Sequence, residues 1–247
     1  MIARTKWPGI ALGVCAALIT QSAMAGATLT HDLREIQVST DVTLNGINVA
    51  QGDAGTPDSD GAAFLKRVLS SVPSGSNPDA FAEASAYQDS SFDAAPVFTS
   101  ISAEGTVSTH AQIFEFSGTF DATGDADSVF TIRFTIDSPQ DWTISASIVD
   151  TGSGETGRVR LREYQGEDIF LLQNATGSDS GFGTLDPGEY ELIGEARALS
   201  FASSATAVVQ FREAQFDFDF TIVPEPASGL LMLLVSPMLL RRRSAAR

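Results

Sequence analysis

The side chains best suited to bind a ligand are aspartates, which gather in two short stretches. Asp53, Asp58 and Asp60 lie in a Gly-rich segment, and Asp121, Asp125 and Asp127 follow the spacing D-x-x-x-D-x-D. Calcium prefers a shell of several oxygen ligands, which carboxylates on Gly-containing loops supply. Neither stretch has the spacing of an EF-hand loop. These six residues are therefore candidate calcium ligands, and solvated acidic loops are the alternative.

Aromatic side chains provide a second kind of candidate binding surface. Tyr87, Tyr164, Tyr190 and Trp142 have ring faces of the kind that stack on sugars. Trp142 alternates in phase with Ile144, so we expect it to point into the core. Tyr87 and Tyr164 fall in loop-like contexts and are the better candidates for a sugar-binding surface.

A stripe of arginines occurs on one predicted strand. Arg158, Arg160 and Arg162 alternate with Val159 and Leu161, so the arginine side chains share one face. We expect them to pair across strands with the acidic side chains of the segment 189–195. The alternative is a contact with an anionic glycan, which the acidic remainder of the surface would repel.

Groups that perform nucleophilic or metal-assisted catalysis are scarce. The chain has one cysteine, Cys15, and two histidines, His31 and His110, and it lacks the G-x-S-x-G and H-E-x-x-H motifs. A glycosidase-type pair of carboxylates stays open, because spacing in sequence does not fix distance in space. We expect a protein that is not an enzyme and needs no cofactor, with calcium as the one candidate ion.

The overall charge excludes one class of partner. The 247 residues include 15 basic and 31 acidic side chains, which gives a net charge of -16 at pH 7. Nucleic acid is not expected as a partner, because phosphate binding needs a surface rich in Lys and Arg. The hydrophobic share of 43% is too high for a disordered chain.

Alternating hydrophobic and polar residues dominate the second half of the chain. Phe130, Ile132, Phe134 and Ile136 share one face, and the segment 142–148 repeats the pattern. Such strands, separated by turn residues and without a long helical period, are typical of an antiparallel β-sandwich or jelly roll. We expect a mainly β ectodomain over 26–222, with one core that the 16 Phe residues fill.

Two local irregularities are predicted within these strands. Val209 and Phe211 have odd numbers, whereas Phe216, Phe218 and Phe220 have even numbers. A strand keeps its faces unless its register slips, so a bulge or break is expected near 212–214. The segment 185–190 contains Pro-Gly at the central positions of a predicted type II turn.

The segment 52–92 differs from the rest of the predicted ectodomain. It begins with Gly, Asp and Pro residues typical of a loop, and Phe64, Leu65, Val68 and Leu69 then follow a loose helical spacing. We expect a loop and short-helix insertion here, with a further turn of helix over 80–87.

The N-terminus has the features of a secretory signal peptide. Arg4 and Lys6 precede an apolar run over 10–19, which is too short to span a bilayer. Ala23 and Ala25 then form the small-x-small pattern that signal peptidase recognises. Cleavage after Ala25 is predicted, which removes residues 1–25 and with them the only cysteine.

The C-terminus has three parts in a fixed order. Pro224, Glu225 and Pro226 come first, an apolar segment over 227–240 follows, and Arg241, Arg242 and Arg243 close the series. Positive charge after an apolar segment fixes a cytoplasmic end. Together with export of the preceding domain, this order predicts a membrane-spanning precursor.

In this order, the tail 223–247 resembles the PEP-CTERM sorting signal. The resemblance implies that an exosortase in the membrane recognises the tail and cuts near Pro-Glu-Pro. It further implies an inner-membrane precursor whose product reaches the cell surface or the extracellular matrix. The ectodomain resembles the uncharacterised secreted β-domains that often precede this signal, to which no reaction is attached.

The sequence as a whole favours an exported, non-enzymatic surface or matrix protein. The expected role is structural or adhesive, in association with exopolysaccharide. A carbohydrate-binding module, with calcium as a candidate ligand, is the second hypothesis. A secreted hydrolase is the third, and it would need two carboxylates that face each other across a cleft.

Overall fold

The computed structural model describes residues 26–44, 46–56, 64–74, 77–93, 96–113, 120–151, 156–173, 176–203 and 209–223. Thirteen strands and no helix occur in these ranges. The strands are β1 (Ala27–Leu44), β2 (Ile47–Gly55), β3 (Phe64–Ser74), β4 (Asn77–Phe92), β5 (Val97–Phe98), β6 (Ser100–Ile113), β7 (Phe120–Ile136), β8 (Gln140–Asp150), β9 (Thr156–Glu163), β10 (Asp168–Gln173), β11 (Gly177–Leu185), β12 (Gly188–Ser203) and β13 (Gln210–Val223).

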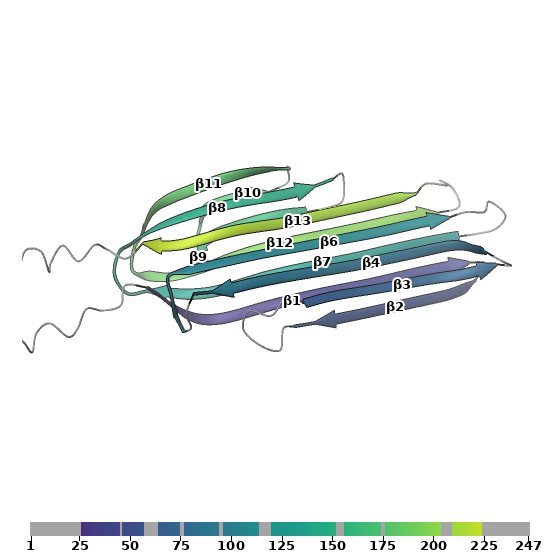
Figure 1. Cartoon of the computed structure of the whole chain (residues 1–247), viewed down its shortest axis with the longest axis horizontal. Helices are drawn as coiled ribbons and strands as arrows, with labels where there is room; N and C mark the ends of the chain where they lie inside the picture. The colour runs from purple at the N-terminus through teal and green to yellow at the C-terminus, as the bar shows by residue number, and fades with distance from the viewer. Residues whose placement is uncertain are drawn as a thin grey trace, which may run out of the picture.

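The strands form two antiparallel sheets that pack face to face (Figure 1). The seven-stranded sheet has the order β10-β9-β12-β7-β1-β2, and β5 pairs with β1. The six-stranded sheet has the order β11-β8-β13-β6-β4-β3. The chain crosses between the sheets several times, for example from β7 to β8. The antiparallel β-sandwich expected from the sequence is therefore confirmed.

Alternation along the strands decides which side chains enter the core. In β6 every second residue from Ile101 to Ile113 is buried, and the same period holds in β8 and in most of β13. Phe130, Phe134 and Trp142 point inward as their spacing predicts. The largest rings therefore meet between the sheets, as in the T-shaped pair of Phe130 and Phe218.

The helices predicted within 52–92 are wrong. Residues 64–74 form β3 and residues 77–92 form β4, and the two strands pair as an antiparallel hairpin. In β4 the inward positions are taken by alanines from Ala80 to Ala86. Alanine carries a weak hydrophobic signal and favours helices, so the local pattern is misleading and long-range pairing decides the structure.

The bulge predicted near 212–214 is also wrong. β13 pairs with β6 from Gln210 to Thr221 with no register shift. Phe211 instead lies on the outer face and keeps 58% of its surface exposed. The phase change therefore marks an outward aromatic residue. Among the described Phe residues, Phe81, Phe182, Phe201 and Phe211 lie on outer faces, so the core does not hold all sixteen as expected.

The predicted type II turn after β11 is wrong as well. A type II turn needs a positive φ at its third residue, which is Gly188 here. Among the described glycines a positive φ occurs at Gly46, between β1 and β2. Gly188 already starts β12 in an extended conformation. The hydroxyl of Tyr190 donates to the carbonyl of Asp186 at 2.6 Å and holds the connection closed.

The core changes character along the length of the sandwich. Toward the end where β1 begins and β13 ends, it consists of large side chains, including Phe98, Phe134 and Trp142. Toward the other end a separate cluster consists mainly of small ones, such as Ala82, Ala111 and Ala202. Small inward side chains let two sheets approach closely.

Glycines fit the places where the two sheets come closest. A Cβ on Gly124 of β7 would lie 2.8 Å from the backbone carbonyl oxygen of Glu83 in the opposite sheet. Phe216 fills the space beside two further glycines, since a Cβ on Gly105 or Gly194 would lie 2.2 or 2.5 Å from its ring. The separation between the two sheets therefore depends on glycines at these positions as much as on the large core side chains.

Replacement of Gly124 with Ala is expected to destabilise the fold by about 1–3 kcal/mol, because the methyl group meets backbone that cannot move alone. Urea unfolding followed by Trp fluorescence measures the change.

The matched control is Gly177→Ala, since a Cβ there meets nothing within 4 Å. It should alter the free energy of unfolding by less than about 0.5 kcal/mol. Equal stability of the two variants would contradict the close approach of the sheets at Gly124.

Candidate functional site: the outer face of the six-stranded sheet

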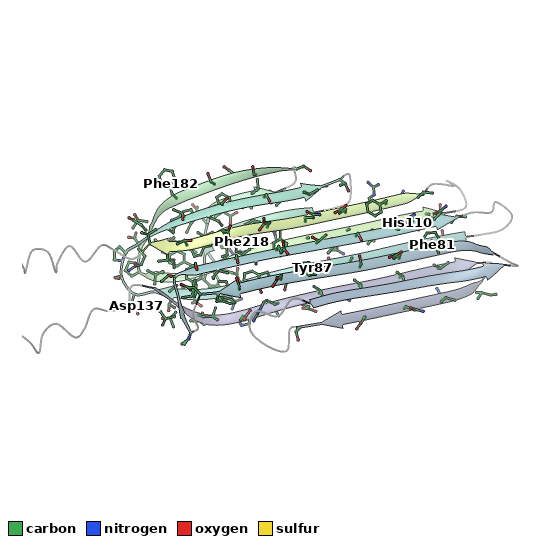
Figure 2. All side chains as sticks on the ribbon, viewed as in Figure 1. Phe81, Tyr87, His110, Asp137, Phe182 and Phe218 are labelled. Atoms are coloured by element: carbon green, nitrogen blue, oxygen red, sulfur yellow. The ribbon has the colours of Figure 1, made fainter. Side chains whose placement is uncertain are left out.

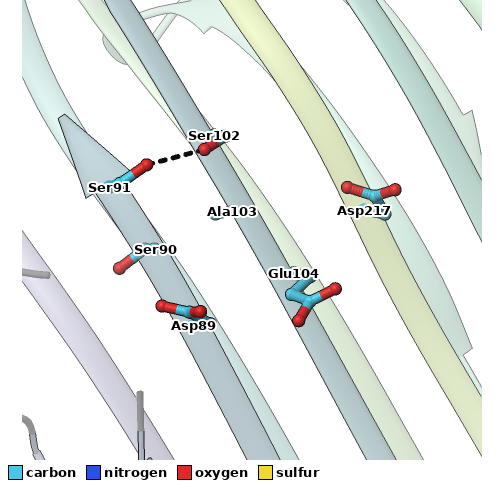
Figure 3. A pocket seen from close by; sticks show the side chains of 7 residues that line it. All are labelled: Asp89, Ser90, Ser91, Ser102, Ala103, Glu104 and Asp217. Carbon is cyan, nitrogen blue, oxygen red and sulfur yellow. Dashed lines mark hydrogen bonds between the residues drawn. The ribbon is translucent and has the colours of Figure 1, made fainter. Parts of the chain in front are cut away.

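Three carboxylates form a row across the middle of the six-stranded sheet. Asp89 of β4 is directly opposite Glu104 of β6, which is directly opposite Asp217 of β13. All three side chains belong to the outward set of their strands (Figure 3). Like charges at directly opposite positions destabilise a sheet, so packing of the fold does not explain this row.

The row borders a shallow depression of about 180 Å³. The residues that line it are Asp89, Ser90, Ser91, Ser102, Ala103, Glu104 and Asp217. The hydroxyls of Ser91 and Ser102 are hydrogen-bonded across the strands at 2.8 Å (Figure 3). A second depression of about 290 Å³ continues past Ser91 and Ser102 toward Asp219 and Thr221. The surface is therefore acidic and rich in hydroxyls.

The crowding of carboxylates perturbs their neighbours. Partial burial, together with the charges of Asp219 and Glu104, raises the pKa of Asp217 above its ordinary value. Burial, followed by the charges of Asp89 and Glu104, also raises the pKa of the Tyr87 hydroxyl on the same face. Burial is the largest cause of both pKa shifts, and the negative charge of the neighbouring carboxylates adds to it.

This arrangement can accept hydrogen bonds and attract cations. None of its lining residues is His, Lys, Arg or Cys. The sequence did not reveal the row, although the alternation Phe216-Asp217-Phe218-Asp219 indicates two outward carboxylates. Their meeting with Glu104 and Asp89 depends on strand pairing between distant parts of the chain, which leaves no local signal.

The candidate calcium ligands do not form a common site in the structure. Asp121, Asp125 and Asp127 lie within β7, so the predicted loop is wrong. Small inward residues between them (Ala122, Gly124 and Ala126) hid the strand pattern. Asp125 and Asp127 lie 3.8 and 3.3 Å from nitrogens of Arg197.

Asp53 lies in β2, directly opposite the inward-facing Val38, whereas Asp125 and Asp127 face outward. Asp58 and Asp60 lie outside the described residues. Within the described ranges no group of three or more His, Cys, Asp or Glu side chains could hold a metal ion.

The arginine stripe pairs with acidic side chains on neighbouring strands, and two of its three arginines pair with the predicted segment 189–195. Arg158 pairs with Glu195 and Arg162 with Glu191, and each pair is directly opposite in register. Arg160 pairs with Asp168 of β10. The stripe is therefore neutralised by its neighbours and offers little free positive charge to an anionic glycan.

Glu191 is the centre of this network. Its side chain is 4% exposed and accepts hydrogen bonds from Arg162 at 2.7 Å and from Arg133 at 3.1 Å. Burial alone would raise the pKa of Glu191, but the two arginines outweigh burial and lower it. The guanidinium carbon of Arg133 also lies 4.2 Å from the ring centre of Tyr164. Arg133 therefore covers one face of a ring that is predicted to bind sugar.

The remaining predicted aromatic residues divide between core and surface. Trp142 and Tyr190 are buried, at 4% and 3% exposure. Tyr87 belongs to the outward set of β4, beside the carboxylate row. Of the four rings singled out in the sequence, Tyr87 alone lies on the candidate face.

The two predicted processing signals lie outside the described residues. They comprise Ala23 and Ala25, Pro224, Glu225 and Pro226, the apolar segment 227–240, and Arg241, Arg242 and Arg243. In the part of the chain that the structure does describe, there is no helix long and apolar enough to cross a membrane.

Comparisons with known proteins do not assign the chain to a family. No family model matches the chain, and its sequence matches no curated protein. Among solved structures, the chain is similar to the enzymatically active domain of tailspike protein 4 of bacteriophage CBA120, with 9% identity and a TM-score of 0.19 over 64% of this chain and 19% of the other.

A structure of infectious bursal disease virus, Gx strain, is similar with 8% identity and a TM-score of 0.21, over 84% of this chain and 59% of the other. The chain thus spans about a fifth of the tailspike domain and 59% of the viral chain. At these TM-scores neither similarity bears on the function.

Replacement of Asp217 with Asn is expected to stabilise the fold at pH 7 by roughly 0.2–1 kcal/mol, because it removes repulsion in the carboxylate row. A raised pKa in the folded state means that stability is greatest at low pH and falls as Asp217 ionises. The gain should therefore disappear below about pH 3.5, where the carboxyl is protonated in both states.

Urea unfolding at pH 3.5 and pH 7 measures the difference. Asp137→Asn removes one charge from an exposed turn and serves as the control. A loss of stability in Asp217→Asn at pH 7, or an equal gain in Asp137→Asn, would contradict the repulsion.

Replacement of Glu191 with Gln is expected to cost about 1–3 kcal/mol at pH 7, because two arginines lose a buried carboxylate. A lowered pKa in the folded state means that this stabilisation is present above about pH 4.5 and is lost as the pH falls. The two proteins should therefore converge in stability toward pH 3.

Thermal unfolding across this pH range provides the measurement. Glu195→Gln breaks the more exposed pair with Arg158 and should cost clearly less. If both variants lost the same stability at every pH, burial of Glu191 would not be what strengthens its network.

Proposed function

We propose that this chain is an exported, non-enzymatic protein of the cell surface or extracellular matrix. Signal peptidase removes residues 1–25, and an exosortase recognises the tail 223–247, which resembles the PEP-CTERM signal. Before that step, the apolar segment 227–240 holds the precursor in the inner membrane, and Arg241, Arg242 and Arg243 keep its end in the cytoplasm. The role is structural or adhesive, in association with exopolysaccharide.

One observation supports this proposal above the others. β1 begins at Ala27, two residues after the predicted signal cleavage, and β13 ends at Val223, immediately before Pro224. Cleavage at both predicted positions would therefore remove no described strand. Both strand ends lie at the same end of the sandwich (Figure 1). A tail attached there can reach the membrane while the rest of the domain extends away from it.

The arrangement of titratable groups supports a non-enzymatic role. His31 lies on β1 and His110 on β6, in different sheets, and both belong to the outward sets of their strands. Asp89, Glu104 and Asp217 project side by side from one sheet face. A glycosidase pair instead flanks the bond that it breaks from two sides.

A carbohydrate-binding module is the second candidate. The observation that favours it is the composition of the outer face of the six-stranded sheet, where carboxylates, hydroxyls and exposed aromatic rings occur together. Calcium dependence belongs to this alternative and has no supporting ligand cluster in the described residues.

Replacement of Pro224, Glu225 and Pro226 with Ala tests the sorting step. The expected result is a full-length precursor, without the signal peptide, that stays in the membrane fraction. Intact-mass measurement and cell fractionation in the native host detect it.

The matched control is Ser228→Ala, which changes the same tail outside the motif and should be processed normally. A processed product of the triple variant at normal levels would show that Pro-Glu-Pro is not the recognised motif.

A further inference from the structure

Three aromatic rings lie where strand alternation calls for polar side chains. Phe81 of β4, His110 of β6 and Phe211 of β13 come from three neighbouring strands of the six-stranded sheet. Each belongs to the outward set of its strand, whose other described members are mostly Ser, Thr, Asp, Glu and Gln. An exposed cluster of apolar side chains on a polar face indicates an interaction site, whereas a single exposed apolar residue does not.

The rings form one continuous group. Phe81 and His110 meet edge to face, with ring centres 4.7 Å apart and planes at 88°. His110 and Phe211 have ring centres 6.5 Å apart and planes at 71°. Figure 2 shows Phe81 and His110 together near the end of the sandwich that lies away from the termini. Phe211 is the exposed member of the group, with 58% of its surface accessible, whereas Phe81 and His110 are half-buried.

Polar groups border the rings on the same face. Glu83 is directly opposite His110 in register, and Gln112 is directly opposite Phe81. Glu213 is two residues from Phe211 on β13 and accepts a hydrogen bond from Gln215 at 2.6 Å. The group thus combines ring faces with carboxylate and amide oxygens that accept hydrogen bonds.

This combination fits a sugar chain. The C–H groups of a sugar ring are polarised by neighbouring oxygens and are attracted to the negative face of an aromatic ring. Sugar hydroxyls donate to carboxylates. Glu83 and Glu213 beside the rings, and a net charge of -16 for the chain, oppose an anionic polymer. The same charge opposes a second copy of this chain as the occupant.

We propose that the cluster of Phe81, His110 and Phe211 binds an uncharged polysaccharide by ring stacking. The inference rests on the proposed function, in which the protein is displayed among exopolysaccharide. It adds the class of ligand and the place of contact. At about 3.3 Å per residue, the 14 residues of β13 span roughly 45 Å, so the cluster lies far from the end that carries the tail.

Native gel electrophoresis of the full chain, purified in detergent micelles, tests the proposal. The gels contain galactomannan, hydroxyethyl cellulose or dextran as uncharged probes, and alginate as an anionic probe. At least one uncharged probe should retard the chain, and alginate should not. Phe211→Ser should weaken this retardation about fivefold or more, because it removes the most exposed ring of the cluster.

The control is Phe182→Ser, since Phe182 is 85% exposed on β11, near the opposite end of the same sheet (Figure 2). It should leave retardation unchanged. The proposal is overturned if no uncharged probe retards the chain, if alginate retards it equally, or if both variants weaken binding to the same degree.

Sedimentation of the same samples tests the alternative occupant, which is a second copy of this chain. A dimer that Phe211→Ser dissociates would assign the cluster to self-association and would overturn glycan binding. Failure of either experiment leaves export and sorting intact, because those steps are tested through the tail motif and the fate of the precursor.

Discussion

Phe216 lies beside two glycines, Gly105 of β6 and Gly194 of β12, and this contact joins the two sheets at the middle of the sandwich. A methyl group on either glycine would overlap the ring, so the sheets keep their separation only with these three residues in place. On one side of this point the core consists of large rings, and on the other of alanines.

The two outer faces differ in how their charged side chains are arranged. On the seven-stranded sheet, arginines of β7 and β9 meet the carboxylates of β12, and burial of Glu191 between Arg133 and Arg162 strengthens the pairing. On the six-stranded sheet, carboxylates meet carboxylates in the row from Asp89 to Asp217. The pairs on the first face stabilise the fold, whereas the like charges on the second face repel one another.

Hydrophobic residues that alternate strictly along the chain are placed correctly by the sequence, whereas small residues and the irregularly spaced hydrophobic residues of β3 are not. The alternation around Phe130 and Trp142 gave the right strands and the right inward face. The sequence predicts a loop for the Asp-rich segment of β7 and a helix for the alanines of β4, and both predictions are wrong. Ala and Gly contribute little to a hydrophobic pattern, yet alanines make up most of the second core cluster.

The sequence by itself determined a two-sided β architecture and an acidic chain, because alternation and charge are local properties. The two terminal processing signals are predictions from short motifs. Only the tertiary structure decided which outward residues become neighbours. The spacing of Phe211 predicts a register slip, but β13 pairs with β6 without a bulge, which places the Phe211 ring beside His110. Strand pairing joins residues far apart in the chain, and no local pattern encodes such a pairing.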